Sequence, residues 1–232
     1  MQYIANQSAR SKLLDEKNRA GLYIDGFNLY HAIDDLGEGF LKWADYWKLG
    51  EIIIPSRSER LVTVCYCTAY YPDARKKWRH QQFVGALECK GVDVVRGHYV
   101  REDMECRACD TTWKKPTEKA GDINVAIHLL RDAFADDIDH AYLISQDSDQ
   151  SATARMFAQQ FPEKKLTTVA PPGRNFSVHI ENYAHGRVKL TRDHIERCVM
   201  PEIVFKPGVA NVRRPREYAP PDGWVHPDRR NR

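Results

Sequence analysis

The stretch from Ala141 to Asp149 constrains the fold of this chain more than any other. Residues 141–144 (Ala-Tyr-Leu-Ile) are too few for a helix and lead straight into a polar turn that carries Asp147 and Asp149. A short continuous apolar run before a turn is typical of a buried strand in a parallel sheet. Apolar residues at roughly helical spacing follow over 150–160. The sequence therefore predicts a strand, a turn and a helix, in that order.

The place of these two carboxylates favours a ligand site. Asp147 and Asp149 would lie at the carboxyl end of a central strand, where open α/β sheets bind their ligands. The two side chains of an Asp-x-Asp turn can converge on one hard cation. A plainer interpretation is that Asp147 or Ser148 only caps the following helix. The local sequence leaves both interpretations open.

Strands and helices are predicted to alternate along most of the chain. Residues 20–24 read as a strand that ends in Asp25, Gly26 allows a sharp turn after it, and Asn28 is expected to cap a helix over 29–36. The other predicted strands are 60–70, 92–95, 141–144 and 165–169, and the other predicted helices are 43–50, 73–90, 122–134, 150–160, 174–183 and 191–198. Such alternation predicts an α/β fold in which a central parallel sheet lies between two layers of helices.

A third carboxylate begins one of these helices. Asp122 stands in the first turn of the helix over 122–134, where the helix dipole favours a negative charge. That preference alone would account for the residue. The helix has apolar residues at i, i+4, i+7 and i+11, which predicts that one face packs on the sheet. The residues of this predicted buried stripe are Ile123, Ile127, Leu130 and Phe134.

A basic cluster lies at the start of the helix over 73–90. Its members are Arg75, Lys76, Lys77 and Arg79. The cluster follows the carboxyl end of the strand over 60–70, so it would flank the same sheet edge as the carboxylates. Positive charge there could hold the phosphates of a nucleic acid. A helix face that is merely solvated is the competing interpretation.

The charge of the chain is unevenly distributed. The net charge of all 232 residues is +3, whereas residues 206–232 carry seven Lys/Arg against three acidic residues, a balance of +4 that leaves −1 for the rest. We therefore divide the chain into an N-terminal arm (1–19), one α/β domain (20–205) and a basic, Pro/Arg-rich tail (206–232). Such a tail suits a polyanionic partner, although an ordinary solvated tail would look the same.

Composition also bears on where the protein works. The content of hydrophobic residues is 42%, and no apolar run approaches the ~20 residues that span a bilayer, so we expect no membrane partner. The first residues lack the apolar core of a secretory signal. Six cysteines in a chain of this size do not resemble a disulfide framework, which favours a cytoplasmic protein. Cys106 and Cys109 form a C-x-x-C pair, which is half of a zinc site or simply two thiols in a loop.

The carboxylates at the predicted sheet edge need compensation. If Asp25, Asp122, Asp147 and Asp149 converge, four negative charges repel one another over a short distance. Divalent cations offset such repulsion directly, because carboxylate oxygens are hard ligands. Mg²⁺ or Mn²⁺ held by clustered aspartates is suited to phosphodiester hydrolysis.

Three segments resemble the three motifs of the NYN domain, a branch of the PIN-like nucleases: 23–29 (YIDGFNL), 118–126 (EKAGDINVA) and 143–149 (LISQDSD). Cys106, Cys109 and the turn over 171–173 are similar to one bacterial subgroup. The resemblance implies a three-layer α/β/α PIN-like (Rossmann-like) domain with a metal-dependent ribonuclease site. It implies metal-binding and catalytic roles for Asp25, Asp122, Asp147 and Asp149. The supporting residues would be Asn28, Ser145, Ser148, Asn124 and His128.

Two positions depart from the family pattern. His128 stands where the family often has a further Asp, and Gln146 stands where a Gly is usual. We expect a Mg²⁺/Mn²⁺-dependent endoribonuclease that acts on single-stranded or structured RNA, with a homodimer left open. One alternative is an NYN-type RNA-binding module with impaired catalysis, marked by His128. A less favoured one is an Asp-x-Asp nucleotide-sugar transferase, which would leave Asp25 and Asp122 unexplained.

Overall fold

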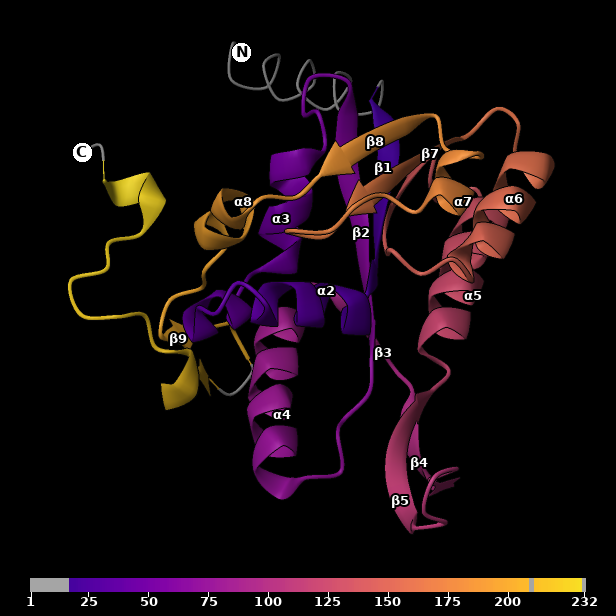
Figure 1. Ribbon diagram of the computed structural model, residues 1–232. Helices are drawn as coiled ribbons and strands as arrows, with labels where there is room; N and C mark the ends of the chain where they lie inside the picture. The colour runs from indigo at the N-terminus through magenta and orange to yellow at the C-terminus, as the bar shows by residue number, and fades with distance from the viewer. Residues whose placement is uncertain (1–16, 209–210, 231–232) are drawn as a thin grey trace.

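The fold is built on one six-stranded sheet (Figure 1). The computed structural model describes residues 17–208 and 211–230. The strand order is β3-β2-β1-β6-β7-β8, and all neighbouring strands are parallel. The strands are β1 (Asn18–Asp25), β2 (Glu59–Thr68), β3 (Asp93–Arg96), β6 (His140–Ile144), β7 (Lys165–Ala170) and β8 (Gly186–Lys189). The last of these, β8, was not predicted from the sequence.

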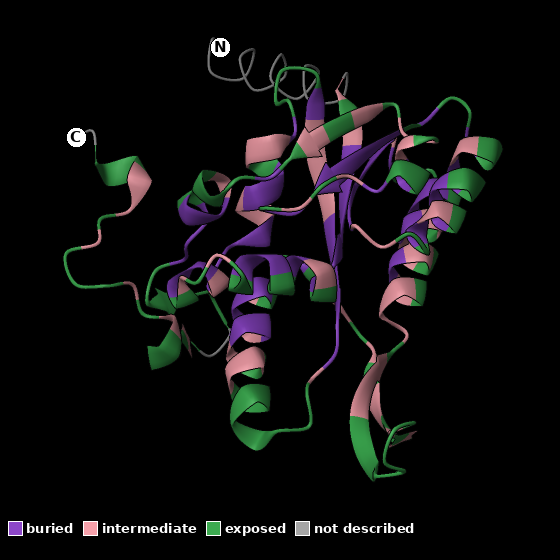
Figure 2. Ribbon diagram, in the orientation of Figure 1, coloured by how far each residue is buried: buried purple, intermediate pink, exposed green. Residues whose placement is uncertain are grey.

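Helices cover both faces of this sheet, as predicted. One side carries α2 (Gly26–Asp34), α3 (Tyr46–Ile53), α4 (Ala74–Cys89) and α8 (Arg192–Arg197), and the other carries α5 (Gly121–Phe134), α6 (Gln150–Gln160) and α7 (Val178–Glu181). Leu22 and Ile24 of β1 pack into the first apolar cluster, while Tyr23 between them packs into the second. Both faces of β1 are therefore buried (Figure 2), which explains its continuous apolar run.

The connectivity brings two distant segments together at the middle of the sheet. From β1 the chain adds β2 and then β3 on one side, and it later adds β6, β7 and β8 on the other. The order thus reverses between β1 and β6, where Ile24 pairs with Ile144. Open α/β sheets bind ligands outside the carboxyl ends of the strands at such a switch point. Asp25 and the turn after Ile144 both lie there.

Residues 98–119, for which the sequence predicted neither a strand nor a helix before Asp122, form a hairpin. The antiparallel strands β4 (His98–Glu105) and β5 (Thr112–Lys119) project from the body of the molecule (Figure 1). None of their residues is buried, so the hairpin lacks the apolar face by which a strand is usually recognised. Pro116 within β5 also argues against a strand in sequence. The prediction was wrong because these strands pair with each other and not with the buried central sheet, so no buried apolar face marks them in the sequence.

Three of the four residues in the predicted buried stripe of α5 are exposed, whereas Leu130 packs against the second apolar cluster. Ile123, Ile127 and Phe134 are 62%, 55% and 61% exposed. The face that packs on the sheet contains Val125, Leu129, Asp132 and Ala133. Both sets have helical spacing, so periodicity could not choose between them. Asp132 can belong to the buried face because its Oδ2 accepts a hydrogen bond from the Tyr23 hydroxyl at 2.8 Å.

The described part of the C-terminal segment 206–232 packs on the domain. Its short elements are β10 (Val212–Arg213), which pairs with β9 (Ile203–Val204), and the 3₁₀ turns η2 (Arg216–Tyr218) and η3 (Pro227–Arg229). A further 3₁₀ turn, η1 (Gly39–Lys42), follows α2. Buried Glu196 of α8 accepts hydrogen bonds from Trp224 Nε1 at 2.8 Å, from Arg192 Nη1 at 2.8 Å and from Arg230. Several tail side chains are therefore engaged with the body.

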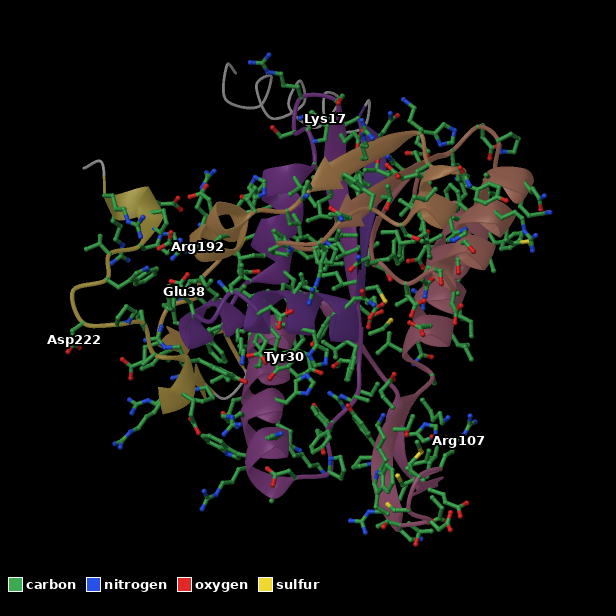
Figure 3. The ribbon with its side chains drawn as sticks, in the orientation of Figure 1. Lys17, Tyr30, Glu38, Arg107, Arg192 and Asp222 are labelled. Carbon is green, nitrogen blue, oxygen red and sulfur yellow. The ribbon has the colours of Figure 1, made fainter. Side chains whose placement is uncertain are left out.

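Two further predictions concerned the N-terminal arm and membrane-spanning segments. Most of the predicted arm 1–19 lies outside the described residues, and residues 18 and 19 begin β1. Within 17–208 and 211–230, no helix is long and apolar enough to cross a bilayer. On the surface, Arg192 Nη2 donates to Glu38 Oε2 at 2.7 Å, and the two labelled side chains lie close together in Figure 3.

Candidate active site

Asp25 is the most firmly held of the predicted site residues. It is the last residue of β1, is 5% exposed and caps α2. Its Oδ1 accepts from the Asn28 backbone N–H (3.1 Å), and its Oδ2 accepts from Asn28 Nδ2 (2.6 Å) and Ser145 Oγ (2.9 Å). The prediction that Asn28 caps this helix was wrong, because α2 already begins at Gly26. A Cβ at Gly26 would lie 2.3 Å from the Cys67 carbonyl oxygen, so glycine is required there.

A chain of hydrogen bonds joins Asp25 to the turn after β6. The Ser145 hydroxyl, which donates to Asp25, accepts from the Asp147 backbone N–H at 3.0 Å. Asp147 Oδ1 in turn accepts from the Asp149 N–H at 2.9 Å, and Asn28 Oδ1 accepts from the Gln146 N–H at 3.2 Å. The turn over residues 147–149, in which the Asp147 side chain accepts from the Asp149 N–H, thus belongs to the site. Neither Asp147 nor Ser148 caps α6, whose N-cap is Asp149 without a side-chain hydrogen bond.

Asp122 and Glu118 lie at the same sheet edge and come from the segment where β5 leads into α5. Asp122 lies in the first turn of α5, and its carbonyl accepts from Gln150 Nε2 of α6 at 2.9 Å. Glu118 lies near the end of β5, and its buried Oε1 has no hydrogen-bond partner within the described residues. A Cβ at Gly97 or Gly121 would come within 2.9 and 2.8 Å of that oxygen, so the two glycines make room for it. No role for Glu118 was predicted, although it stands four residues before Asp122.

The carboxylates raise one another's pKa. Burial raises the pKa of Asp122 to about 6, with further contributions from the charges of Asp25, Asp147, Glu118 and Asp149. Burial also raises the pKa of Asp25, although the hydrogen bonds from Asn28 and Ser145 oppose this, and the charge of Asp147 adds to it. The pKa of Glu118 is raised by burial and by Asp25. The structure therefore brings the four predicted aspartates into one electrostatic cluster, with Glu118 as a fifth member.

The donor atoms fit a hard divalent cation. All are carboxylate oxygens, the ligands that Mg²⁺ and Mn²⁺ prefer. Among the residues described, no three of these carboxylates bring ligand atoms within 4.8 Å of one another in this conformation. Mg²⁺ is commonly bound through one or two carboxylates while it keeps several waters. The arrangement is suitable, and the identity and number of ions stay predictions.

Three of the predicted supporting residues lack the hydrogen bonds to the aspartates that a direct supporting role would require. Within the described parts of the chain, no hydrogen bond joins the side chains of Ser148, Asn124 or His128 to the four aspartates. Ser148 is exposed. His128 lies further along α5, near Cys65 and Asp93. The direct support that the structure shows comes from Asn28 and Ser145.

The basic cluster lies where it was predicted, at the start of α4. Asp73 caps this helix, accepting from the Lys76 N–H at 2.8 Å. Arg75, Lys76 and Lys77 are exposed, while Arg79 forms an ion pair with Glu217 of the C-terminal segment at 3.0 Å. One of the four positive charges is thus already paired within the chain.

A cavity of about 220 Å³ lies between the basic cluster and Asp25. Gly26 and Phe27, which follow Asp25, form part of its wall, and Tyr30 (labelled in Figure 3) forms another. The wall is mainly aromatic, and it carries Lys42, Lys76 and Arg79. The cavity was not predicted, because its aromatic residues come from segments as distant as Tyr99 and Tyr218.

The cysteines of the predicted zinc pair lie at the tip of the β4–β5 hairpin. The hydroxyl of Thr111 lies 3.2 Å from Cys109 Sγ, and its hydrogen bond lowers the pKa of that thiol. In the described ranges, no third histidine, cysteine or carboxylate joins Cys106 and Cys109 within 4.8 Å. His98, eight residues before Cys106 in the sequence, begins β4 at the opposite end of the hairpin. Zinc at this pair stays a prediction.

Comparison with known proteins identifies the family. The sequence profile of the NYN domain matches residues 19–162, which is more than half of the chain. The chain belongs to the NYN domain family. This confirms the resemblance seen in the three motifs, and it places the three-layer α/β/α fold among the PIN-like domains, a nuclease superfamily. The matched range contains all four aspartates and Glu118.

Two similar proteins extend the comparison beyond the family profile. The 6-hydroxy-3-succinoylpyridine 3-monooxygenase HspA of Pseudomonas putida is 24% identical over 246 residues, covering 89% of this NYN protein and 77% of that one. The crystal structure of a protein of unknown function from Vibrio parahaemolyticus superposes with a TM-score of 0.54 and 19% identity, covering 77% of this chain and 96% of that chain. At this identity, the second likeness shows the fold alone.

Proposed function

We propose that this NYN domain protein is a Mg²⁺- or Mn²⁺-dependent endoribonuclease that acts in the cytoplasm. The observation that carries the proposal is the electrostatic cluster of Asp25, Asp122, Asp147, Asp149 and Glu118 at the switch point of the sheet. Like charges that raise one another's pKa mark functional sites more often than structural ones. Membership of the family supports the same conclusion.

The residues divide the work in a simple way. Asp25 is fixed by three hydrogen bonds and so offers a rigid carboxylate, whereas Asp122, with a pKa of about 6, can accept a proton near neutral pH. A bound Mg²⁺ or Mn²⁺ would activate water and stabilise the attacking and leaving oxygens of the phosphodiester. Arg75, Lys76 and Lys77 would position the backbone of single-stranded or structured RNA through its phosphates.

Cleavage of a 5′-labelled single-stranded RNA tests the proposal. We expect the purified protein to cleave it in the presence of Mn²⁺ and to stop on addition of a chelator. Asp147→Asn should lose this cleavage, because it removes one carboxylate from the cluster and keeps the acceptor of the Asp149 N–H. Equal cleavage by wild type and Asp147→Asn would assign the activity to a contaminant and end the proposal.

The two alternatives predicted from the sequence would give other results in binding and turnover experiments. An RNA-binding module with impaired catalysis would bind RNA in a salt-dependent manner and would show no metal-dependent turnover. A nucleotide-sugar transferase would bind a nucleotide sugar in calorimetry. A nuclease is expected to show no specific binding of that ligand.

The comparison with HspA supports a second candidate function. The name of that relative describes oxidation of a hydroxypyridine that carries a succinoyl group. The wall of the aromatic cavity beside Asp25 carries Lys76, so the cavity suits a small aromatic acid. Lys42 and Arg79, also in the wall, form ion pairs with Asp34 and Glu217. Oxygenation would also require dioxygen and a reductant. Calorimetry with 6-hydroxynicotinic acid separates the candidates, because specific binding that Lys76→Ala abolishes would favour this one.

A further inference from the structure

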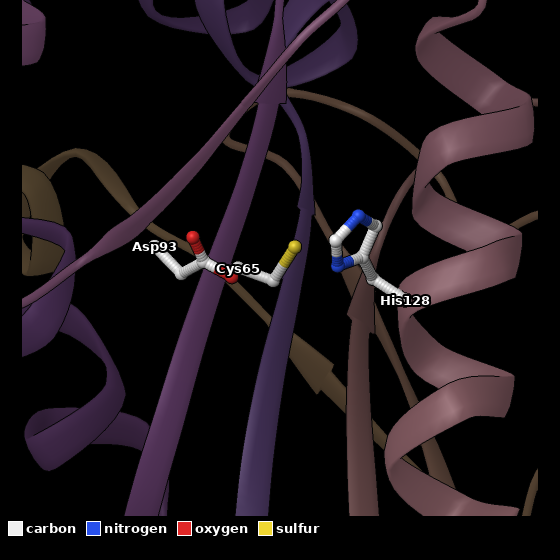
Figure 4. A group of neighbouring side chains, drawn as sticks. All are labelled: Cys65, Asp93 and His128. Carbon is white, nitrogen blue, oxygen red and sulfur yellow. The ribbon is translucent and has the colours of Figure 1, made fainter.

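Three metal-ligating side chains meet on the sheet face that α5 covers, away from the aspartates. Cys65 lies in β2, its register partner Asp93 begins β3, and His128 faces them from α5 (Figure 4). One sulfur, one carboxylate oxygen and one imidazole nitrogen lie within 4.8 Å of one another. Each comes from a different element, so the grouping is a product of the tertiary fold.

An ordinary structural role does not account for one member of this group, His128. Its Nδ1 is buried and has no hydrogen-bond partner within the described residues, whereas Asp93 is exposed. The only polar contact recorded there for the Cys65 thiol is Cys67 Sγ, at 3.8 Å. Buried polar atoms of native proteins normally have partners. The unpaired imidazole nitrogen is therefore an observation that needs an explanation.

A nucleophilic cysteine is a poor explanation. The imidazole would have to lie between the thiol and the carboxylate to act as base and be oriented by the acid. In Figure 4, Cys65 and Asp93 lie together on the strands, and His128 faces both from the helix. The thiol is also only 1% exposed, which keeps a substrate away from it.

The chemistry of the three donors indicates a transition metal. A thiolate, an imidazole and a carboxylate together suit Zn²⁺, whereas Mg²⁺ and Ca²⁺ prefer oxygen ligands alone. Metal–ligand bonds of about 2.0–2.3 Å place the donors of a tetrahedral site roughly 3.3–3.8 Å apart. Donors that already lie within 4.8 Å need only small side-chain movements to reach that spacing.

We propose that Cys65, Asp93 and His128 form a second metal site, which binds Zn²⁺. It is separate from the aspartate cluster, since His128 lies six residues, or about 9 Å of helix, beyond Asp122. A metal there would fasten β2, β3 and α5 to one another. Because α5 carries Asp122 at its first turn, this site would also fix the position of that carboxylate. The proposal does not depend on ribonuclease activity.

Titration of the full-length, metal-stripped protein with Co²⁺ tests this site, because Co²⁺ reports thiolate ligands by a charge-transfer band in the near ultraviolet. We expect one equivalent to bind, Zn²⁺ to displace it, and Cys65→Ser to lose the band. His128→Asn, which changes a partly exposed residue, should weaken binding at least about 10-fold. It keeps the test valid if Cys65→Ser does not fold.

The hairpin thiols supply the matched control. The double variant Cys106→Ser/Cys109→Ser removes two cysteines without touching the proposed ligands, so it should keep the band and the affinity. Loss of the band in this variant would assign the metal to the hairpin and overturn the proposal. Absence of any thiolate band in wild type, or full retention in His128→Asn, would overturn it as well.

Discussion

Ser145 Oγ, directly after β6, donates a hydrogen bond to Asp25 Oδ2 at the end of β1 at 2.9 Å, and the same hydroxyl accepts from the Asp147 N–H at 3.0 Å. The buried Ser145 side chain thus holds both the Asp25 carboxylate and the turn that presents the Asp147 carboxylate. The two strands belong to opposite halves of the sheet, and Ser145 is a buried polar link between them, beside the hydrogen bond from the Gln146 N–H to Asn28 Oδ1.

Ser145→Ala should therefore impair the site more than the fold. We expect RNA cleavage to fall by about 10–100-fold, as for other residues that orient a ligand, and the free energy of unfolding to fall by about 1 kcal/mol. Cleavage rates and thermal melting measure the two effects. Ser148→Ala is the matched control, because Ser148 is exposed, and an equal loss of cleavage in both variants would contradict the linking role.

Asp147→Asn should separate stability from activity. The charge of Asp147 contributes to the raised pKa values of Asp25 and Asp122, so its removal relieves repulsion in the metal-free protein. We expect the variant to melt at the same temperature or higher, while cleavage falls by about 100-fold or more. Mn²⁺ should raise the melting temperature of wild type by mass action and that of the variant much less. Equal shifts would show that Asp147 does not share a metal site.

The raised pKa of Asp122 predicts a pH dependence of stability. A pKa of about 6 in the folded state, against an unfolded value near 4, means that the folded state binds more protons between these values. The contribution of Asp122 is therefore present below pH 4 and is lost as the pH rises to about 6. Urea unfolding of the metal-free protein should show this decline, and Asp122→Asn should flatten it. Asp110→Asn at the hairpin tip should leave the decline unchanged.

The exposed cations of α4 should set the salt dependence of RNA binding. Arg75→Ala/Lys77→Ala removes two predicted phosphate contacts, which should lower the slope of log affinity against log salt by about 1.4 for single-stranded RNA. The weakening should be similar for all RNA sequences. Lys165→Ala/Arg187→Ala removes the same formal charge from β7 and β8, away from α4, and should leave the slope unchanged. If both pairs change it equally, the cluster is only part of a general positive field.

Glu196 should fasten the C-terminal segment. Burial alone would raise its pKa, but hydrogen bonds from Trp224, Arg230 and Arg192 outweigh this and hold the pKa at about 2. Glu196→Ala leaves these donors without their acceptor and should lower the free energy of unfolding by more than about 1 kcal/mol. Limited trypsin digestion should then release the end of the chain sooner. Glu202→Ala, which removes an exposed acid nearby, should alter neither result.

The sequence predicted what depends on short-range pattern. The buried strand before Asp147, the turn at Gly26 and the parallel sheet all follow from apolar runs and turn residues, and the three motifs predicted the family. The gathering of Asp25, Asp122 and Asp147 was also accessible, because parallel strands end at one edge. Each of these inferences needs only local sequence and the geometry of the α/β fold.

Tertiary context decided the remainder. The stripe from Ile123 to Phe134 and the face around Leu129 have equal spacing, so only the packed structure shows which one meets the sheet. The hairpin has no buried face, and Glu118 joins the cluster only because that hairpin returns the chain beside Asp25. Tyr218 reaches the aromatic cavity from a segment that composition describes only as a basic tail.

The double role of Asp25 bears on how the family would lose its activity. Asp25 caps α2 and is buried, so selection for folding alone would retain it. Asp149 is exposed and makes no side-chain cap, so in the proposed enzyme its role in catalysis would be the main reason to preserve it. Relatives released from catalysis should therefore lose Asp149 long before Asp25. An intact Asp149 is then the better sign of a working enzyme, and Asp25 alone marks only shared ancestry.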